Sequence, residues 1–172
     1  MKKVLILHGV KKGIFPHWQV WLESELKKQN FEVSFPSFKE HDLTRVKAIY
    51  EHMQKFEPDI VICHSVGVAL WFHLVNTYKI KKIQKLMLVA PILSNSTEPN
   101  FKPFLPFSLP KDLRAKEAII AFGDNDKFAP LEDALALQSA LNIGMKVMPK
   151  AGHFECEDGF GELDCALEWV QR

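Results

Sequence analysis

The sequence has few cysteines, almost no net charge and no long apolar run. Its 172 residues include only three cysteines, Cys63, Cys156 and Cys165. An odd number without zinc-finger spacing excludes a cysteine-based zinc site as the organising element and favours a reduced, cytoplasmic setting. A chain of this length is large enough to bury a core without disulfides or metals.

The charge balance gives no reason to expect a polyanionic partner. Lys and Arg total 22 and Asp and Glu total 21, so the net charge is +1, and we expect no nucleic-acid and no membrane partner. No apolar segment approaches membrane-spanning length. The run Met1–Leu7 resembles the start of a signal peptide, but His8 and Gly9 end it too early, so we expect a first strand there.

Strand-like and helix-like runs alternate along the chain, which predicts a three-layer α/β/α fold with about six mostly parallel strands. The predicted strands are Lys3–His8, Glu32–Phe35, Asp59–His64, Lys85–Ala90, Ala118–Phe122 and Lys146–Met148. The predicted helices are Trp18–Gln29, Leu43–Phe56, Val66–Tyr78, Leu131–Leu141 and Phe160–Gln171. No repeat, low-complexity tract or linker divides the chain, so residues 1–172 are expected to form a single domain.

The segment 91–113 interrupts this alternation. It is rich in proline and phenylalanine, with Pro91, Pro99, Pro103, Pro106, Pro110, Phe101, Phe104 and Phe107. These prolines exclude a long regular helix or strand. The segment is either an irregular connection packed on the core or a partial lid over a site, and we favour the partial lid because long ordered loops are often functional.

The run Asp59–Ala69 carries the strongest functional signal. An apolar β-branched strand leads directly to Ser65, and a helix follows without a loop. Such a tight turn would strain Ser65 and place its hydroxyl at a helix N-terminus, as a serine nucleophile requires. The alternative interpretation is a serine that caps the helix.

A serine nucleophile needs a base, and His153 is the best placed of the seven histidines. It lies in a turn between the last predicted strand and the last predicted helix. His52 and His73 fall within helical patterns, which favours surface or packing roles. His8 follows the first strand and is expected to shape the loop there, whereas His64 should point away from Ser65.

The base in turn needs an acid, and Asp126 is our choice over Asp124 in the turn after the fifth strand. The resulting order, Ser65, Asp126, His153, is that of α/β-hydrolases. Asp and Asn also stabilise tight turns through their own side chains, which is the alternative role for both aspartates. We predict Ser65, His153 and Asp126 as a catalytic triad because each follows its own strand and would lie at one edge of the sheet.

Acyl transfer also requires hydrogen-bond donors for the oxyanion. The expected donors are the backbone N–H groups of Val10, after His8-Gly9, and of Val66, after the nucleophile. We expect a compact apolar acyl pocket bordered by His17, Trp18, Phe104 and Phe107. The Trp18 side chain also fits a helix face packed against the sheet, and Cys63 is expected to be a small buried hydrophobe.

With these motifs the chain resembles the small serine hydrolases of the α/β-hydrolase superfamily typified by retinoblastoma-binding protein nine. The matching segments are His8-Gly9, His17-Trp18, Trp21-Leu22, His64-Ser65-Val66-Gly67, Leu88-Val89-Ala90-Pro91, Asn125-Asp126 with Phe128, Gly152-His153, Glu157 and Gly159-Phe160-Gly161-Glu162. The resemblance implies a minimal α/β-hydrolase fold with the triad named above. Cys63 stands where the family usually has glycine.

We therefore expect a serine hydrolase that cleaves small carboxylic esters through an acyl-enzyme, with no metal or organic cofactor. The alternatives are a peptidase or thioesterase with the same triad, or a protein-interaction module on a hydrolase scaffold. The expected partner is a small-molecule ester or amide substrate. No sequence feature indicates a particular protein partner.

Overall fold

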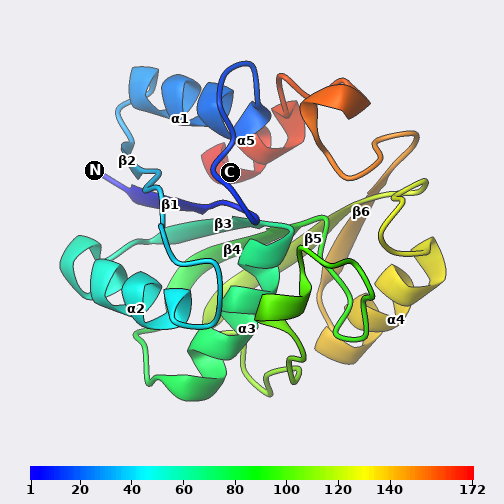
Figure 1. The fold of residues 1–172 in the computed structure, drawn as a ribbon. Coiled ribbons are helices and arrows are strands. Elements are labelled where there is room, and N and C mark those ends of the chain that lie inside the picture. Colours follow the sequence, from blue (N-terminus) through cyan, green and yellow to red (C-terminus); the bar gives the residue numbers. More distant parts are fainter.

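The computed structural model describes residues 1–172 and contains a six-stranded sheet between two layers of helices (Figure 1). The strand order is β2-β1-β3-β4-β5-β6, and every neighbouring pair is parallel. The strands are β1 (Lys3–Leu7), β2 (Glu32–Ser34), β3 (Ile60–His64), β4 (Ile83–Val89), β5 (Ala115–Gly123) and β6 (Gly144–Met148). The predicted three-layer fold is confirmed.

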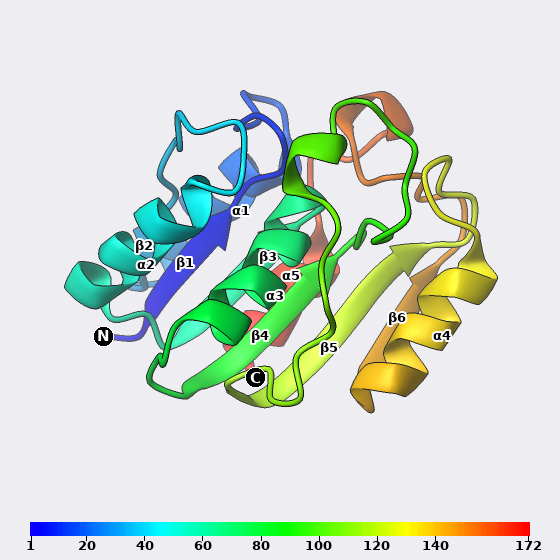
Figure 2. The same cartoon turned by 60° about the horizontal axis from the view of Figure 1, so that its bottom comes forward.

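The five α-helices divide between the two faces of the sheet (Figures 1 and 2). They are α1 (Trp18–Lys28), α2 (Arg45–Phe56), α3 (Val66–Thr77), α4 (Leu131–Leu141) and α5 (Asp164–Gln171). Helices α1 and α5 cover one face, and α2, α3 and α4 cover the other. None of the five is both long and apolar enough to cross a membrane.

Strand β3 shows why the sheet needs both layers. All five of its residues are buried. Ile60 and Ile62 belong to the apolar cluster beneath α1 and α5, whereas Val61 and Cys63 belong to the cluster beneath α2, α3 and α4. Successive side chains of a strand point to opposite faces, so an unbroken apolar run is what a central parallel strand requires.

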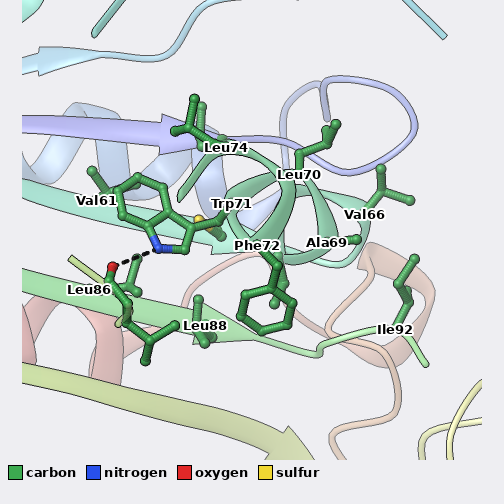
Figure 3. Packing of buried hydrophobic residues seen from close by; sticks show 14 of the residues in the cluster. Val61, Val66, Ala69, Leu70, Trp71, Phe72, Leu74, Leu86, Leu88 and Ile92 are labelled. Carbon is green, nitrogen blue, oxygen red and sulfur yellow. Dashed lines mark hydrogen bonds between the residues drawn. The ribbon is translucent and has the colours of Figure 1, made fainter. Parts of the chain in front are cut away.

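Helix α3 is the centre of the larger cluster (Figure 3). Trp71 and Phe72 on this helix are fully buried. The Trp71 indole N–H donates to the Leu113 carbonyl oxygen at 3.1 Å, so the polar edge of the ring is satisfied. This bond ties α3 to the chain just before β5.

Segment 91–113 runs over this helix layer without regular structure, apart from one short 3-10 turn, η1 (Lys102–Phe104). Phe101 and Phe104 are buried. The ring nitrogen Nε2 of His73 lies 2.9 Å from the Phe104 carbonyl oxygen. The middle of the segment is therefore packed onto α3.

The last helix differs most from the prediction, because it begins at Asp164 and not at Phe160. Residues before it form a second 3-10 turn, η2 (Cys156–Asp158), which ends at Gly159 with φ of +92°. The Phe160 carbonyl oxygen then accepts the N–H of Trp18 at 3.2 Å. The Phe160 carbonyl thus holds the start of α1, and α5 begins only after this residue.

The chain topology creates a crevice at one end of the sheet. From β1 the chain passes through α1 to the edge strand β2, whereas from β3 it passes through α3, on the opposite face, to β4. Loops that leave two adjacent parallel strands toward opposite faces separate at the strands' carboxyl ends, where such sheets bind ligands. The residues after β1 and β3 are therefore placed to form a site.

The packing of β4 against α3 yields a stability prediction. Leu88→Ala, at a fully buried position, should lower the free energy of unfolding by about 2–5 kcal/mol through lost burial and a residual cavity. Urea unfolding measures this difference. The matched control, Leu135→Ala on α4, is 46% exposed and should change it by less than about 0.5 kcal/mol; equal effects at both positions would contradict the assignment of the core.

Candidate active site

Ser65 lies in the turn that joins β3 directly to α3. Its backbone has φ of +56° and ψ of −119°, a conformation that costs a non-glycine residue energy. The Ser65 N–H donates to the Val89 carbonyl oxygen at 2.9 Å, which fixes the turn against β4. The strain expected from the sequence is therefore present, and the serine makes no side-chain cap of α3.

The residues on either side of Ser65 explain how so tight a turn is accommodated. A Cβ atom on Gly67 would lie 2.9 Å from the Leu7 carbonyl oxygen, so only glycine lets α3 begin against the end of β1. Cys63, two residues before the serine, is fully buried in the apolar core. Burial raises the pKa of its thiol, which makes Cys63 a packing residue and not a nucleophile.

His153 reaches Ser65 from the loop between β6 and α5. Its Nε2 lies 2.8 Å from Ser65 Oγ, and both residues are buried. Its Nδ1 lies 2.7 Å from Asp126 Oδ2. With the proton on Nδ1, the imidazole donates to the carboxylate and accepts the hydroxyl proton of the serine.

The turn after β5 holds the histidine loop at three neighbouring points. Asp126 binds the His153 ring, while its second oxygen accepts the N–H of Phe128 at 2.8 Å. Asn125 Oδ1 accepts the N–H of Gly152, and Asp124 Oδ1 accepts the N–H of Lys150, both at 2.8 Å. Asp124 is exposed and binds the Lys150 N–H rather than the imidazole, so it has a positioning role distinct from that of Asp126.

Two further groups fix the backbone of His153. Its N–H donates to Asp158 Oδ2 at 3.0 Å, and its carbonyl oxygen lies 2.9 Å from His64 Nε2. Burial, together with the nearby His153, lowers the pKa of His64, so this imidazole stays neutral and donates to the carbonyl. Sequence reasoning missed Asp158, although its place five residues after the histidine marks a turn-stabilising acid.

His17, His64 and Glu155 form the group of side chains best able to hold a metal ion. One ligand atom from each lies within 4.8 Å of the others. The two imidazoles already make hydrogen bonds, because His17 Nδ1 accepts the N–H of Gln19 at 3.3 Å and His64 Nε2 meets the His153 carbonyl. His17 Nε2 then faces Glu155 Oε2 at 3.4 Å. The group as it stands is a hydrogen-bonded support beside His153.

A cavity of about 550 Å³ opens above the serine. Ser65 and His153 line it together with Gly9 and Val10 of the loop after β1. Neither the N–H of Val10 nor that of Val66 donates to a backbone carbonyl. Val66 is the first residue of α3, so its N–H belongs to the electropositive helix terminus.

The walls of this cavity differ from the predicted pocket. His17 lines it, as expected, but Trp18, Phe104 and Phe107 do not. Trp18, the first residue of α1, is buried against the sheet, Phe104 is buried in the core against α3, and Phe107 packs on Phe72. Periodicity and composition predicted that these aromatics are near the site but not which way they face.

The aromatic wall consists of Phe101 and Phe128. The Phe128 ring meets the His153 ring edge-on with centroids 4.7 Å apart, and Phe101 lies against Phe128 at 5.0 Å. The lining is less apolar than expected, because it also includes charged and polar residues: Lys11, Lys12, Glu98, Asn100 and Glu155. The cavity therefore combines an aromatic wall with polar and charged lining residues.

His8 supports the loop after β1 and does not act as a base. Its Nδ1 donates to the Gly9 carbonyl oxygen at 2.9 Å, and its Nε2 accepts the N–H of Phe38 at 3.0 Å. Burial and the nearby Arg45 guanidinium lower the pKa of His8 to about 4. His8 is therefore a neutral imidazole whose two nitrogens are both used in holding the loop.

Comparison with known proteins agrees with this geometry. Residues 4–172 match the family described as serine hydrolase. The chain belongs to this family. A search of curated proteins finds no significant match.

Solved structures show the same fold. The ydeN gene product of B. subtilis has a TM-score of 0.89 and 17% identity, over 99% of this chain and 97% of that chain. A putative YdeN-like hydrolase from Pectobacterium atrosepticum has a TM-score of 0.72 and 22% identity, over 98% and 89% of the two chains. The esterase domain of a Rhodothermus marinus protein has a TM-score of 0.72 and 13% identity, over 99% of this chain and 86% of that chain. The chain is thus a serine hydrolase with an α/β-hydrolase fold.

The lowered pKa of His8 predicts a pH-dependent stability. In the unfolded chain this histidine takes up a proton near its ordinary pKa of 6.5, but in the folded protein only near 4, so folding becomes less favourable as the pH falls through this window. From pH 7 to pH 5 the group should cost roughly 2 kcal/mol of unfolding free energy. Urea unfolding of wild type and His8→Asn at both pH values isolates this loss, and equal losses in the two proteins would refute it.

Proposed function

We propose that Ser65, His153 and Asp126 are the catalytic triad of an esterase that cleaves small carboxylic esters. The observation that carries the proposal is the buried chain of hydrogen bonds at 2.8 Å from Ser65 Oγ to His153 Nε2 and at 2.7 Å from His153 Nδ1 to Asp126. A hydroxyl, an imidazole and an orienting carboxylate in this order are the components of a general-base-activated nucleophile. The cavity above Ser65 gives an ester access to all three.

The first half of the reaction forms an acyl-enzyme. Ser65 Oγ attacks the ester carbonyl carbon while His153 Nε2 takes the hydroxyl proton. The resulting oxyanion accepts hydrogen bonds from the N–H groups of Val10 and Val66. When the tetrahedral intermediate collapses, His153 returns the proton to the leaving alcohol oxygen, and the acyl group stays on Ser65.

The second half regenerates the serine. Water that enters the cavity attacks the acyl carbon as His153 takes its proton, and the same two N–H groups bind the second oxyanion. The carboxylic acid then leaves. Throughout, the Asp126 carboxylate keeps the proton on His153 Nδ1 and stabilises the imidazolium.

An ester is the substrate best supported among those that share this triad. The cavity presents an aromatic wall of Phe101 and Phe128, and polar and charged side chains elsewhere in its lining. This combination suits a small acyl group with a more polar alcohol. The fold is shared with a protein described as an esterase domain and with one described as a thioesterase domain, so the preference for an ester rests on the cavity. Thioester or amide cleavage, or a binding role on the same scaffold, are the outcomes against which the ester is tested.

Within the serine hydrolases, we assign the chain to the small enzymes typified by retinoblastoma-binding protein nine. The support is the end-to-end motif set, including the segment Gly159–Glu162. In the structure this segment lies against the loop after β1, since a Cβ atom on Gly161 would meet the Pro16 carbonyl oxygen at 3.0 Å. The cytoplasmic location and the small-molecule partner stay predictions.

Covalent labelling tests the nucleophile and the substrate class together. A fluorophosphonate should label wild type but not folded Ser65→Ala, because only Ser65 Oγ is activated by His153. Wild type should also hydrolyse p-nitrophenyl acetate faster than the matched thioester and anilide. Unchanged labelling of Ser65→Ala would remove this serine from the reaction. Turnover of the thioester or anilide alone would overturn the ester assignment, and labelling without any turnover would favour the binding role.

The two aspartates of the β5 turn provide a matched pair of variants. Asp126→Asn should lower kcat by about 10⁴-fold, because the amide no longer holds the productive His153 tautomer. Asp124→Asn keeps an oxygen that can accept the N–H of Lys150 and should retain most of the activity. Steady-state kinetics with p-nitrophenyl acetate measures both. The reverse pattern would mean that Asp124 is the triad acid.

A further inference from the structure

Arg45 is the one arginine buried inside the molecule. It is the first residue of α2, is 1% exposed and forms no ion pair with a carboxylate. Burial lowers the pKa of its guanidinium to about 10, so it remains protonated at neutral pH. A buried cation without an anionic partner is costly unless its donors are satisfied.

All three donor groups of Arg45 point at backbone carbonyls. NH1 donates to the Gly9 oxygen at 2.7 Å, NH2 to the Val10 oxygen at 2.9 Å, and Nε to the Glu40 oxygen at 2.7 Å. The guanidinium carbon lies 5.0 Å from the centroid of the Phe104 ring. Two of the three bonds therefore end on the loop that follows β1, and the third ties that loop to the chain before α2.

The Gly9 carbonyl belongs to the same peptide unit as the Val10 N–H. It accepts a second hydrogen bond, from His8 Nδ1 at 2.9 Å. In a planar trans peptide the C=O and N–H bonds point in opposite directions. Two donors that fix the carbonyl therefore also fix the direction of the Val10 N–H, and donation to the carbonyl polarises the unit and strengthens that N–H as a donor.

This peptide unit lies directly beside the nucleophile. A Cβ atom on Gly9 would be 3.3 Å from Ser65 Cβ and 3.6 Å from Ser65 Oγ. Gly9 and Val10 line the cavity together with Ser65. A small rotation of the unit would thus displace the Val10 N–H relative to the position where an oxyanion forms on Ser65.

We propose that Arg45 is a positioning residue that clamps the Gly9–Val10 peptide and so orients the Val10 N–H as an oxyanion donor. The inference rests on the proposed hydrolase function for its kinetic consequence but not for the clamp itself. Arg45 does not line the cavity and acts through the peptide. Lysine cannot replace it, because a single ammonium lacks the fork that reaches two adjacent carbonyls.

The kinetic test compares Arg45→Lys with Arg114→Lys. Arg114 also donates to a backbone carbonyl, that of Ile80. It directly precedes β5 and so lies at the amino ends of the strands, the end of the sheet opposite to Ser65. Arg45→Lys should lower kcat for p-nitrophenyl acetate about 10²–10³-fold, as expected for a lost oxyanion donor. Its KM should change little, because the ground state does not use that donor. Arg114→Lys should match wild type.

A trifluoromethyl ketone, which forms a tetrahedral oxyanion on the serine, adds a readout that a loss of folding stability would not move. Its inhibition constant should rise in Arg45→Lys by the factor by which kcat falls, because both depend on the oxyanion donors. A folded Arg45→Lys with wild-type kcat and wild-type inhibition would overturn the clamp. So would a rise in KM alone.

NMR of the wild-type protein keeps the proposal testable if Arg45→Lys does not fold, or if the protein is no esterase. The Arg45 Nε–H and guanidinium resonances should be resolved and slowly exchanging, since each nitrogen donates to a backbone carbonyl in a buried or partly buried hydrogen bond. Rapid rotation or rapid exchange of this guanidinium would overturn the clamp. Failure of the hydrolase proposal would instead appear as absent fluorophosphonate labelling, with the Arg45 resonances unchanged.

Discussion

The hydrogen bond between Ser65 and His153 is the interaction on which the rest of the site depends. It joins residues 88 positions apart in the sequence, so it exists only if β3 and the loop after β6 end at the same edge of the sheet. The parallel register from β3 through β4 and β5 to β6 provides this alignment. The fold and the chemistry are therefore linked, since a change in strand order would separate the serine from its base.

Hydrogen bonds between loops position the side chains that the sheet brings to one edge. The turn after β5 contacts the histidine loop through Asp124, Asn125 and Asp126, and Arg45 and His8 hold the loop after β1. These side chains bind mainly backbone atoms, so they fix the loops and leave the cavity free. A site built in this way is preorganised, because its donors and base already have their orientation before a substrate arrives.

The sequence predicted most strongly those features that are local. The strand, turn and helix around Ser65 follow from one continuous stretch, and the choice of His153 and Asp126 follows from their positions after strands. The facing of Phe101 and Phe104 was not predictable, because a proline-rich segment has no periodicity and its contacts are set by α3. Arg45 was missed because an arginine at a helix start is usually exposed, and its burial depends on carbonyls 35 and 36 residues earlier.

The central claim is that Ser65 carries the acyl group during turnover. Reaction with p-nitrophenyl acetate, stopped in acid during the first turnover and analysed by peptide mass spectrometry, tests it most directly. We predict a burst of p-nitrophenol close to one equivalent per enzyme and one acetyl group, on the peptide that contains Ser65. Hydrolysis with the acetyl group on another residue, such as the exposed Cys156 at the cavity wall, would contradict it.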